Sequence, residues 1–315
     1  MDPAQFFAAS RLVIVAGKGG VGKTTVTATL ARAAARSGLS TLIVEVEGKS
    51  GLPAVFGQES LTYDEVELAS NVRGRTLTPD DALLEYLRDH GMNRISKRLM
   101  SSGALDIVST AVPGIKDILI LGKVKQLERA EVADLIVLDA PAAGHAITFL
   151  LAARALLDAV RVGPINTQAR EVLDLLTDHE RCQVMLVTLP EETPVNELID
   201  TAYHLEDRVG VALGPVVVNG LYDELAGLDT DPMVAAENAS TTLRDGEAAS
   251  LRAAASFRRR RMELQREQVA RLGARLPLPQ LHLPYLFNAE LGPRELEQLS
   301  QSLLDGIDTL AGARP

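Results

Sequence analysis

Apolar and polar residues along this chain follow two patterns in turn, one typical of strands and one typical of helices. Short runs of mainly apolar residues predict buried strands. These runs cover residues 12–16, 41–46, 135–139, 183–189, 214–219 and 278–283. Between them, apolar residues at helical spacing predict helices at residues 24–37, about 79–129, 147–160, 167–179, from 193 onward, 253–272 and 293–310. Strands that alternate with helices predict an α/β fold with a mostly parallel sheet flanked by helices.

Three segments carry more specific expectations. Residues 61–72 are polar and poorly periodic, so they fit either a pair of edge strands or a loop. Thr193-Pro194 predicts a helix start with a threonine N-cap and a proline in the first helical position. The helix predicted at 253–272 places three apolar residues on one face, namely Phe257, Leu264 and Leu272.

The domain organisation follows from length and composition. The chain has 315 residues, of which 46% are hydrophobic, so it can bury a large core. No stretch has the composition of an interdomain linker. We therefore expect a single domain over residues 1–315, with helical insertions at about 79–130 and 146–180 that form a helical subdomain.

A glycine-rich segment follows the first predicted strand and opens the first long helix. Its sequence is Gly17-Lys18-Gly19-Gly20-Val21-Gly22-Lys23-Thr24-Thr25, which fits the P-loop pattern G-x-x-x-x-G-K-[ST]. Glycines allow consecutive backbone N–H groups to turn toward one anion, and the helix that follows presents its positive end to the same anion. The segment therefore predicts a polyphosphate site.

Two residues of this site predict a metal ion. In a P-loop the lysine, here Lys23, neutralises the terminal phosphates, and the hydroxyl of Thr24 holds Mg²⁺. An aspartate at the end of another strand completes such a site, and Asp139 follows the apolar run at 135–138. A turn-capping role for Asp139 is the alternative.

Charge and cysteine content exclude several classes of protein. The formal net charge is −10, and the basic residues are scattered except at Arg258 to Arg261, so we expect no nucleic-acid partner. Cys182 is the only cysteine, which excludes an intrachain disulfide and a CxxC metal site. We find no signal peptide in residues 1–10 and no apolar run of membrane-spanning length, which predicts a cytoplasmic protein with at most peripheral membrane contact.

Lys18 is a second cation in the loop, at a position where the general P-loop pattern requires none. The segment from Gly17 to Thr25 resembles the deviant Walker A motif of the MinD/ParA/ArsA group, in which the additional lysine reaches the nucleotide of the partner subunit. The resemblance implies a homodimer or a heterodimer with a related chain. The alternative is a surface lysine beside an ordinary P-loop.

More distant segments narrow the resemblance to the ArsA/Get family of anion-transporting and tail-anchored-protein-targeting ATPases, over residues 12 to about 295. The segment 139–145 resembles the second switch of this family, and 113–117 resembles one of its helix starts. Val218-Asn219 and Leu283-Pro284 resemble its adenine-binding strand ends. The resemblance implies ATP and Mg²⁺ as cofactors, with loop residues 17–25, Gly144, Asn219 and Pro284 around the nucleotide.

The chain also departs from better-known members of the family. Better-known members carry an aspartate that orients the attacking water. At this position the present chain offers two glutamates, Glu47 as the first choice and Glu45 as the second. They lie in a Glu-Val-Glu-Gly switch, which actinobacterial ArsA-like proteins share. A displacement of about 1 Å at such a position can cost about a hundredfold in rate. With Cys182 as its only cysteine, the chain lacks the cysteines of metalloid-responsive members and the zinc clamp of many targeting members.

These features predict a dimeric, Mg²⁺-dependent ATPase that acts through its helical subdomain on a protein partner or a hydrophobic client. Helices within 95–130 and 147–176 either form a client groove or pack an ordinary core. One alternative is a nucleotide-regulated scaffold that barely hydrolyses ATP. Another is a partitioning ATPase of the ParA/MinD type, which the acidic charge and the long helical insertion disfavour.

Overall fold

The computed structural model describes residues 1–46, 51–89, 114–141 and 143–310, with the side chains of residues 89 and 143–145 left out. Of the residues singled out above, Glu47 lies outside the described part of the chain. Of Gly144 and His145, in the segment 139–145, only their place in a helix is described. Most of the segment between 79 and 129 that the pattern predicts as helical falls either in two described helices or in the undescribed range 90–113.

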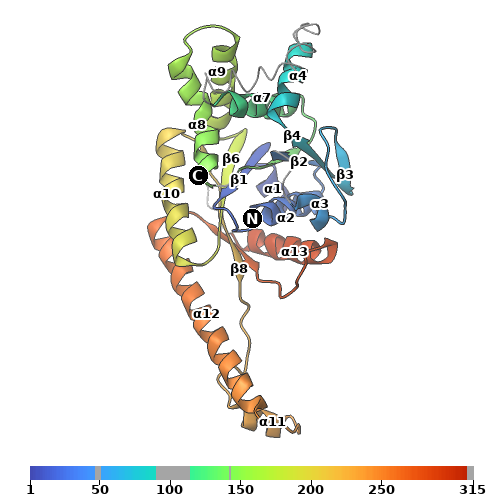
Figure 1. Ribbon diagram of the computed structural model, residues 1–315, viewed down its shortest axis with the longest axis vertical. Coiled ribbons are helices and arrows are strands. Elements are labelled where there is room, and N and C mark those ends of the chain that lie inside the picture. The colour runs from blue at the N-terminus through green and yellow to red at the C-terminus, as the bar shows by residue number, and fades with distance from the viewer. Residues whose placement is uncertain (47–50, 90–113, 142, 311–315) are drawn as a thin grey trace.

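The described chain forms one sheet in the order β3-β4-β2-β5-β1-β6-β8-β9, with β7 beside β6 (Figure 1). Its strands are β1 (Leu12–Gly17), β2 (Thr41–Val46), β3 (Val66–Ala69), β4 (Val72–Leu77), β5 (Leu135–Asp139), β6 (Cys182–Thr188), β7 (Ala212–Leu213), β8 (Val216–Leu221) and β9 (Gln280–Pro284). Every pairing is parallel except β3 with β4. The predicted α/β fold with a mostly parallel sheet is confirmed. Residues 61–72 contain the edge strand β3, which pairs antiparallel with β4, and the first residue of β4.

Helices cover both faces of this sheet. They are α1 (Pro3–Phe7), α2 (Lys23–Arg36), α3 (Leu52–Val55), α4 (Pro79–Asp89), α7 (Ile115–Arg129), α8 (Ala143–Ala159), α9 (Pro164–Thr177), α10 (Glu192–Arg208), α11 (Pro232–Asn238), α12 (Glu247–Arg275) and α13 (Pro293–Thr309). Alternate residues of β1 belong to two different core clusters. Leu12 and Ile14 belong to the cluster that also holds residues of α7 to α10, and Val13 and Val15 belong to the one that holds residues of α1, α2 and α13. Because β1 is buried on both faces, all six of its residues are buried.

Four helices form a layer of their own beyond one end of the sheet. In Figure 1, α4, α7 and α9 lie together at the top of the molecule, and α8 connects this layer to the sheet. The contacts within the layer join α7 to α4, α8 and α9. Since residues 90–113 are not described, the prediction of one domain with helical insertions stays a prediction.

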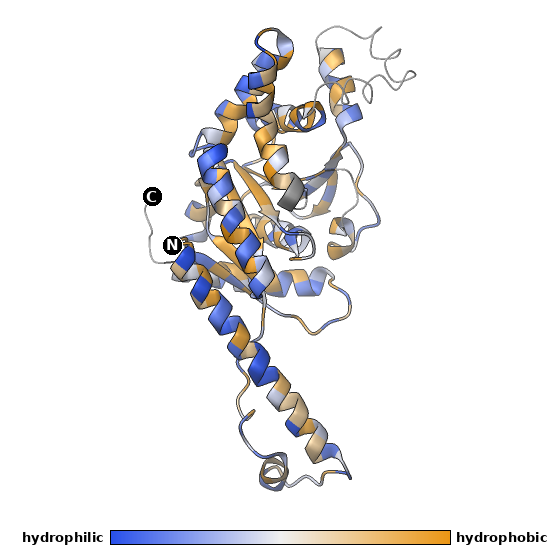
Figure 2. Cartoon of the chain, turned by 60° about the vertical axis from the view of Figure 1, so that its left-hand side comes forward, coloured by the Kyte–Doolittle hydropathy of each residue, from blue (hydrophilic) through white to orange (hydrophobic). Residues whose placement is uncertain are grey.

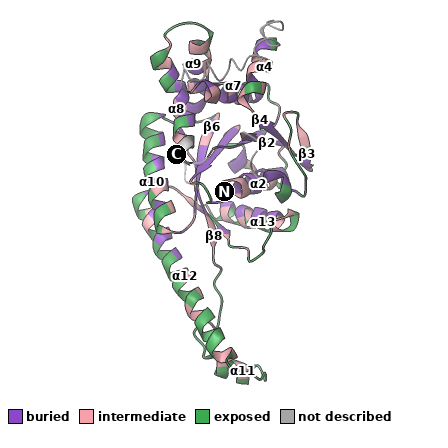
Figure 3. Cartoon of the chain, viewed as in Figure 1, coloured by how far each residue is buried: buried purple, intermediate pink, exposed green. Residues whose placement is uncertain are grey.

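The helix predicted at 253–272 differs from the observed one in length and in burial. Helix α12 runs from Glu247 to Arg275, and its buried residues all lie in its second half, from Met262 to Leu272. Phe257 is 67% exposed. The first half of α12 projects past the sheet beside α11 and the segment that follows β8 (Figures 2 and 3). Among the described residues, the predicted apolar face therefore has no core to pack against there.

The predicted start of helix α10, with Thr193 as N-cap and Pro194 as the first helical residue, is wrong by two residues, and the predicted cap is absent. The helix begins at Glu192, and its N-cap is Glu191, whose side chain caps no helical N–H group. The Glu191 carboxylate instead accepts a hydrogen bond from Arg261 of α12. Thr193 and Pro194 lie in the first turn, where a proline costs no helical hydrogen bond.

Candidate functional site

The glycine loop connects β1 to α2 in a shape that only glycine allows at two positions. A Cβ atom on Gly17 would lie 2.4 Å from the backbone oxygen of Val187 in the adjacent strand. Gly22 has a φ of +89°, and a Cβ atom there would lie 2.3 Å from Nδ2 of Asn219. The sequence of the loop is therefore fixed by close approach of its backbone to β6 and to the end of β8.

Backbone donors of this loop are unused within the described part of the chain. The N–H groups of residues 19–22 make no hydrogen bond to an acceptor in the described ranges. Gly22 is the N-cap of α2, and no side chain caps that helix. A run of unused donors at a helix N-terminus is the arrangement that binds phosphate in proteins.

Lys23 and Thr24 begin α2 directly after the loop. Nζ of Lys23 donates a hydrogen bond to the backbone oxygen of Lys18, 3.2 Å away, so the side chain lies back over the loop. Burial lowers the pKa of Lys23, and the negative charge of Asp139 partly opposes this effect. The ammonium group thus lies beside the loop in an environment that favours an added anion.

Thr24 and Asp139, which lie 115 residues apart in sequence, meet at the end of β5. The hydroxyl of Thr24 donates to Oδ2 of Asp139 at 2.7 Å. The other carboxylate oxygen, Oδ1, is buried and has no hydrogen-bond partner among the described residues. Burial raises the pKa of Asp139 to about 6, although the Thr24 hydrogen bond and the charge of Lys23 both lower it.

This pair of side chains fits a magnesium ion. A hydroxyl oxygen and a carboxylate with an unused oxygen are the hard ligands that Mg²⁺ prefers, and Mg²⁺ keeps several waters of its own. Among the described residues, no group of three or more histidine, cysteine, aspartate or glutamate residues could hold a metal ion. The two residues predicted as metal ligands, Thr24 and Asp139, thus lie in direct contact through their hydrogen bond.

Glu45 lies inside the protein. It is 3% exposed, and its neighbour in register on β5 is Asp139. Oε2 of Glu45 accepts a hydrogen bond of 3.0 Å from the hydroxyl of Thr76 on β4. The side chain is thus tied to the sheet beside Asp139, and its charge contributes to the raised pKa of that group.

Lys18 has a partner within its own chain that the sequence analysis did not identify. Its Nζ lies 2.6 Å from Oε1 of Glu197, in α10. Both side chains remain about two-fifths exposed, 39% and 43%. Glu197 carries no sequence signal for this contact, because the contact depends on how α10 packs against β6 and α8.

The two predicted strand ends also lie at this site. The strand predicted to end at Asn219 ends two residues later, because β8 runs from Val216 to Leu221. Nδ2 of Asn219 donates to the backbone oxygen of Val21 at 2.9 Å, which ties the last residues of β8 to the loop. Pro284 ends β9 in register with Leu221 of β8. Gly144 falls in the first turn of α8, directly after the strand that carries Asp139. Loop, metal-ligand pair and strand ends therefore occupy one region.

Three aromatic side chains beside these strand ends were not identified from the sequence. Tyr222, Tyr285 and Phe287 pack with ring centroids 4.8–5.2 Å apart. The guanidinium of Arg258 lies 5.2 and 5.3 Å from two of these rings. These aromatic residues lie close in sequence to Asn219 and Pro284, and this closeness is the sequence feature that could have identified them.

Comparison with known proteins places these features in one family. The family model described as anion-transporting ATPase matches residues 10–162. The ATPase BagA of Mycobacterium tuberculosis is 34% identical over 221 residues, which are 66% of this chain and 64% of that protein. This chain thus spans just under two thirds of the length of that relative.

Two eukaryotic relatives match a shorter part. ATPase ASNA1 homolog 2 of Paramecium tetraurelia is 30% identical over 143 residues, 44% of this chain and 42% of that protein. ATPase get3 of Neurospora crassa is 26% identical over 145 residues, again 44% of this chain and 42% of the relative. Together with the P-loop and the parallel sheet that carries it, these matches show that the chain belongs to the ArsA/Get family of anion-transporting ATPases, whose members bind ATP.

Proposed function

We propose that this protein hydrolyses ATP in a Mg²⁺-dependent reaction. The observation that carries the proposal is the Thr24–Asp139 hydrogen bond of 2.7 Å, with a second, buried Asp139 oxygen that has no partner in the described part of the chain. A buried unpaired carboxylate oxygen is costly, and a cation bound there would remove that cost. The family of the chain and the names of its relatives, which are called ATPases, support the same reaction.

Each loop residue has a distinct role in this proposal. The N–H groups of residues 19–22 bind the phosphates, and Lys23 places its charge on the terminal phosphates after leaving the backbone oxygen of Lys18. Thr24 and Asp139 hold Mg²⁺, which when bound neutralises phosphate charge. Catalysis by such a site rests on positioning and electrostatic stabilisation rather than on covalent chemistry.

The residue that orients the attacking water is proposed to be Glu47. Glu45, the other candidate, is almost fully buried and bonded to Thr76, so its carboxylate would have to break that contact to reach a water. Asn219 and Pro284 are proposed to flank the base, at the strand ends beside the loop.

Lys18 is proposed to act on the nucleotide of a second subunit, either another copy or a related chain. Its partner in the single chain, Glu197, is a surface group, so the ion pair is weak enough to exchange for a phosphate. The helical layer of α4, α7, α8 and α9 is the part of the chain that is proposed to act on a protein partner or a hydrophobic client.

A nucleotide-regulated scaffold with little hydrolysis is the second candidate. The observation that favours it is the burial of Glu45 against Thr76, since this removes one of the two carboxylates that could orient water. The two candidates share the nucleotide site and differ only in turnover.

Phosphate release from ATP separates the two candidates. The purified protein, Lys23→Ala and Arg275→Gln are compared at saturating ATP and Mg²⁺, where Arg275→Gln is a charge-matched control at the exposed end of α12. Hydrolysis predicts that Lys23→Ala loses at least about a hundredfold in rate and that the control keeps its rate. Glu47→Gln should lose more than Glu45→Gln. If the unaltered protein releases phosphate no faster than Lys23→Ala, the hydrolysis proposal is wrong and the nucleotide-regulated scaffold remains.

A further inference from the structure

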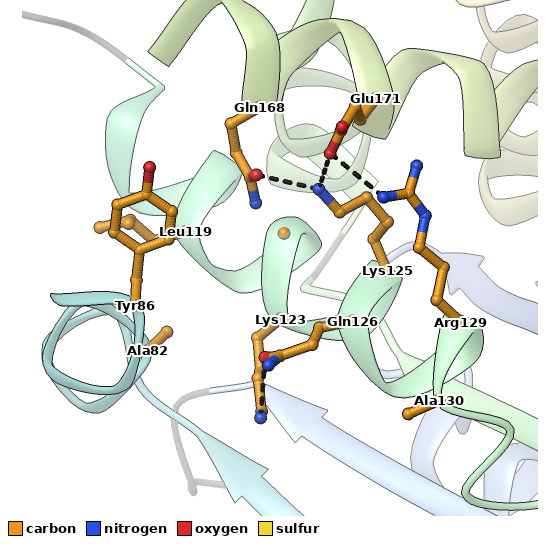
Figure 4. Close-up of a pocket in the computed structure, with 11 residues that line it drawn as sticks. Ala82, Tyr86, Leu119, Lys123, Lys125, Gln126, Arg129, Ala130, Gln168 and Glu171 are labelled. Atoms are coloured by element: carbon orange, nitrogen blue, oxygen red, sulfur yellow. Dashed lines mark hydrogen bonds and ion pairs between the residues drawn. The ribbon is translucent and has the colours of Figure 1, made fainter. Parts of the chain in front are cut away.

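A cavity of about 460 Å³ lies in the helical layer, away from the glycine loop. Its floor is α7, and its walls are Ala82 and Tyr86 of α4 and Gln168 and Glu171 of α9 (Figure 4). This volume is in the range of pockets that hold small organic molecules. None of its lining residues takes part in the nucleotide site described above.

The two ends of this cavity differ in chemistry. Figure 4 shows Tyr86, Leu119 and Ala82 grouped at one end, and Lys125, Arg129 and Glu171 at the other. The first group offers an aromatic ring and aliphatic carbons. The second offers charged and polar groups, so a matching ligand has an apolar body and a polar head.

The polar end carries more positive than negative charge. Nζ of Lys125, whose side chain is 6% exposed, donates to Glu171 and, at 2.9 Å, to Oε1 of Gln168. Arg129 shares the same carboxylate at 3.4 Å. Two cations thus share one carboxylate, while the nearby Lys123 is balanced by Glu85 at 2.6 Å. The excess is one positive charge, in a protein whose net charge is −10.

Donors for an anion remain available at this end. Lys125 has three N–H donors, and two of them are used by Glu171 and Gln168. Arg129 makes one long contact, and the guanidinium group has five donors. The amide NH₂ of Gln168 has no hydrogen bond to a described residue. A carboxylate could accept from these groups by charge-assisted hydrogen bonds.

Gly122 makes room for the amide group of Gln168 in the wall of this cavity. It is an interior residue of α7, where glycine is the least favourable residue after proline. A Cβ atom there would lie 1.9 Å from Nε2 of Gln168. An alanine would therefore push the Gln168 amide away from its position.

We propose that this cavity binds a small monocarboxylate with an apolar body, its carboxylate at Lys125, Arg129 and Gln168 and its body between Tyr86 and Leu119. The inference concerns a separate site and does not rest on the proposed hydrolysis of ATP. An inorganic anion offers the same charge without the apolar body, so it should bind more weakly.

Calorimetric titration of the full chain without nucleotide tests this proposal. The probes are benzoate, its neutral isostere benzamide, and inorganic phosphate. We expect saturable binding of benzoate, with benzamide and phosphate each weaker by about tenfold or more. Equal binding of benzoate and benzamide would overturn the proposal, as would the absence of saturable benzoate binding.

Single substitutions in the cavity test whether benzoate binds there. Arg129→Gln should weaken benzoate about tenfold. Gly122→Ala should weaken it by a similar factor while keeping or raising the midpoint of thermal unfolding, because alanine favours the helix. Arg170→Gln is the matched control, since Arg170 lies exposed on α9 outside the cavity. Unchanged benzoate binding in both Arg129→Gln and Gly122→Ala would show that benzoate binds elsewhere and would overturn the assignment.

Discussion

At the scale of single residues, the ion pair between Lys18 and Glu197 decides whether the second loop lysine is available to a partner. The two atoms lie 2.6 Å apart, but both side chains are about two-fifths exposed. Exposed pairs of this kind contribute from 0 to about 1 kcal/mol. Glu197 therefore holds Lys18 in its own chain only weakly, and removal of its charge should favour a contact in another subunit.

Glu197→Gln should raise the fraction of dimer formed with ATP by up to about fivefold, while the free energy of unfolding changes by less than about 1 kcal/mol. Light scattering of the variant with ATP and with ADP measures this. Glu206→Gln, at an exposed position of the same helix, is the control. An unchanged monomer in the presence of ATP, with no related chain bound, would contradict a role for Lys18 between subunits.

At Gly22 the loop backbone lies close to the side chain of Asn219 in β8. Gly22→Ala requires a side chain at a φ of +89° and 2.3 Å from the amide of Asn219. It should destabilise the fold by about 1–3 kcal/mol and weaken ATP binding at least about tenfold, because the phosphate-binding N–H groups move. Urea unfolding and ATP titration measure the two effects. Gly51→Ala, where a Cβ atom would meet nothing within 4 Å, should change neither.

At the scale of elements, one glutamine joins the long helix to the nucleotide edge of the sheet. Gln265 of α12 is 2% exposed. It accepts from the N–H of Tyr222 at 2.9 Å and donates to the backbone oxygen of Gly220 at 3.0 Å. These two bonds fix the segment directly after Asn219, so the position of α12 and the position of the strand end depend on each other.

Gln265→Ala should lower the free energy of unfolding by about 2 kcal/mol, because two backbone groups lose their partner in a buried place. The variant should also bind ATP less tightly than the unaltered protein, since Asn219 lies next to the loosened segment. Glu267→Ala, an exposed change on the same helix, separates this effect from helix propensity. Equal free energies of unfolding for the two variants would show that the hydrogen bonds of Gln265 with Tyr222 and Gly220 do not stabilise the fold.

The elements that could be predicted from the sequence are those whose cause is local. β1 and β5 are continuous apolar runs, and the glycine loop fits a known pattern, so these strands, the loop and the contact between Thr24 and Asp139 at the end of β5 could be predicted from the sequence. The outward course of α12 could not be predicted, because apolar spacing at Phe257 does not reveal that the sheet ends beneath it. Glu197 and Thr76 could not be identified either, since their contacts with Lys18 and Glu45 join elements distant in sequence.

At the scale of the whole molecule, the sheet separates two helical parts. The layer of α4, α7, α8 and α9 lies beyond one end, and the arm of α11 and the first half of α12 projects from the other (Figure 1). None of the residues of α11 is buried. Among the described helices, none is long and apolar enough to cross a membrane. The proposed nucleotide site lies between these parts. Its loop contacts α10 through Lys18 and Glu197, and it contacts β8 through Asn219, which is followed by Gly220 and Tyr222, the partners of Gln265 in α12.

The central claim is that Thr24 and Asp139 hold the Mg²⁺ of a hydrolysed ATP, and a magnesium titration of phosphate release tests it most directly. The unaltered protein should release phosphate in proportion to bound Mg²⁺ and stop when the metal is chelated. Asp139→Asn, which keeps the side-chain shape and removes its charge, should need at least about tenfold more Mg²⁺ and turn over more slowly. Phosphate release that persists under chelation, or an unchanged Mg²⁺ requirement in Asp139→Asn, would contradict the account.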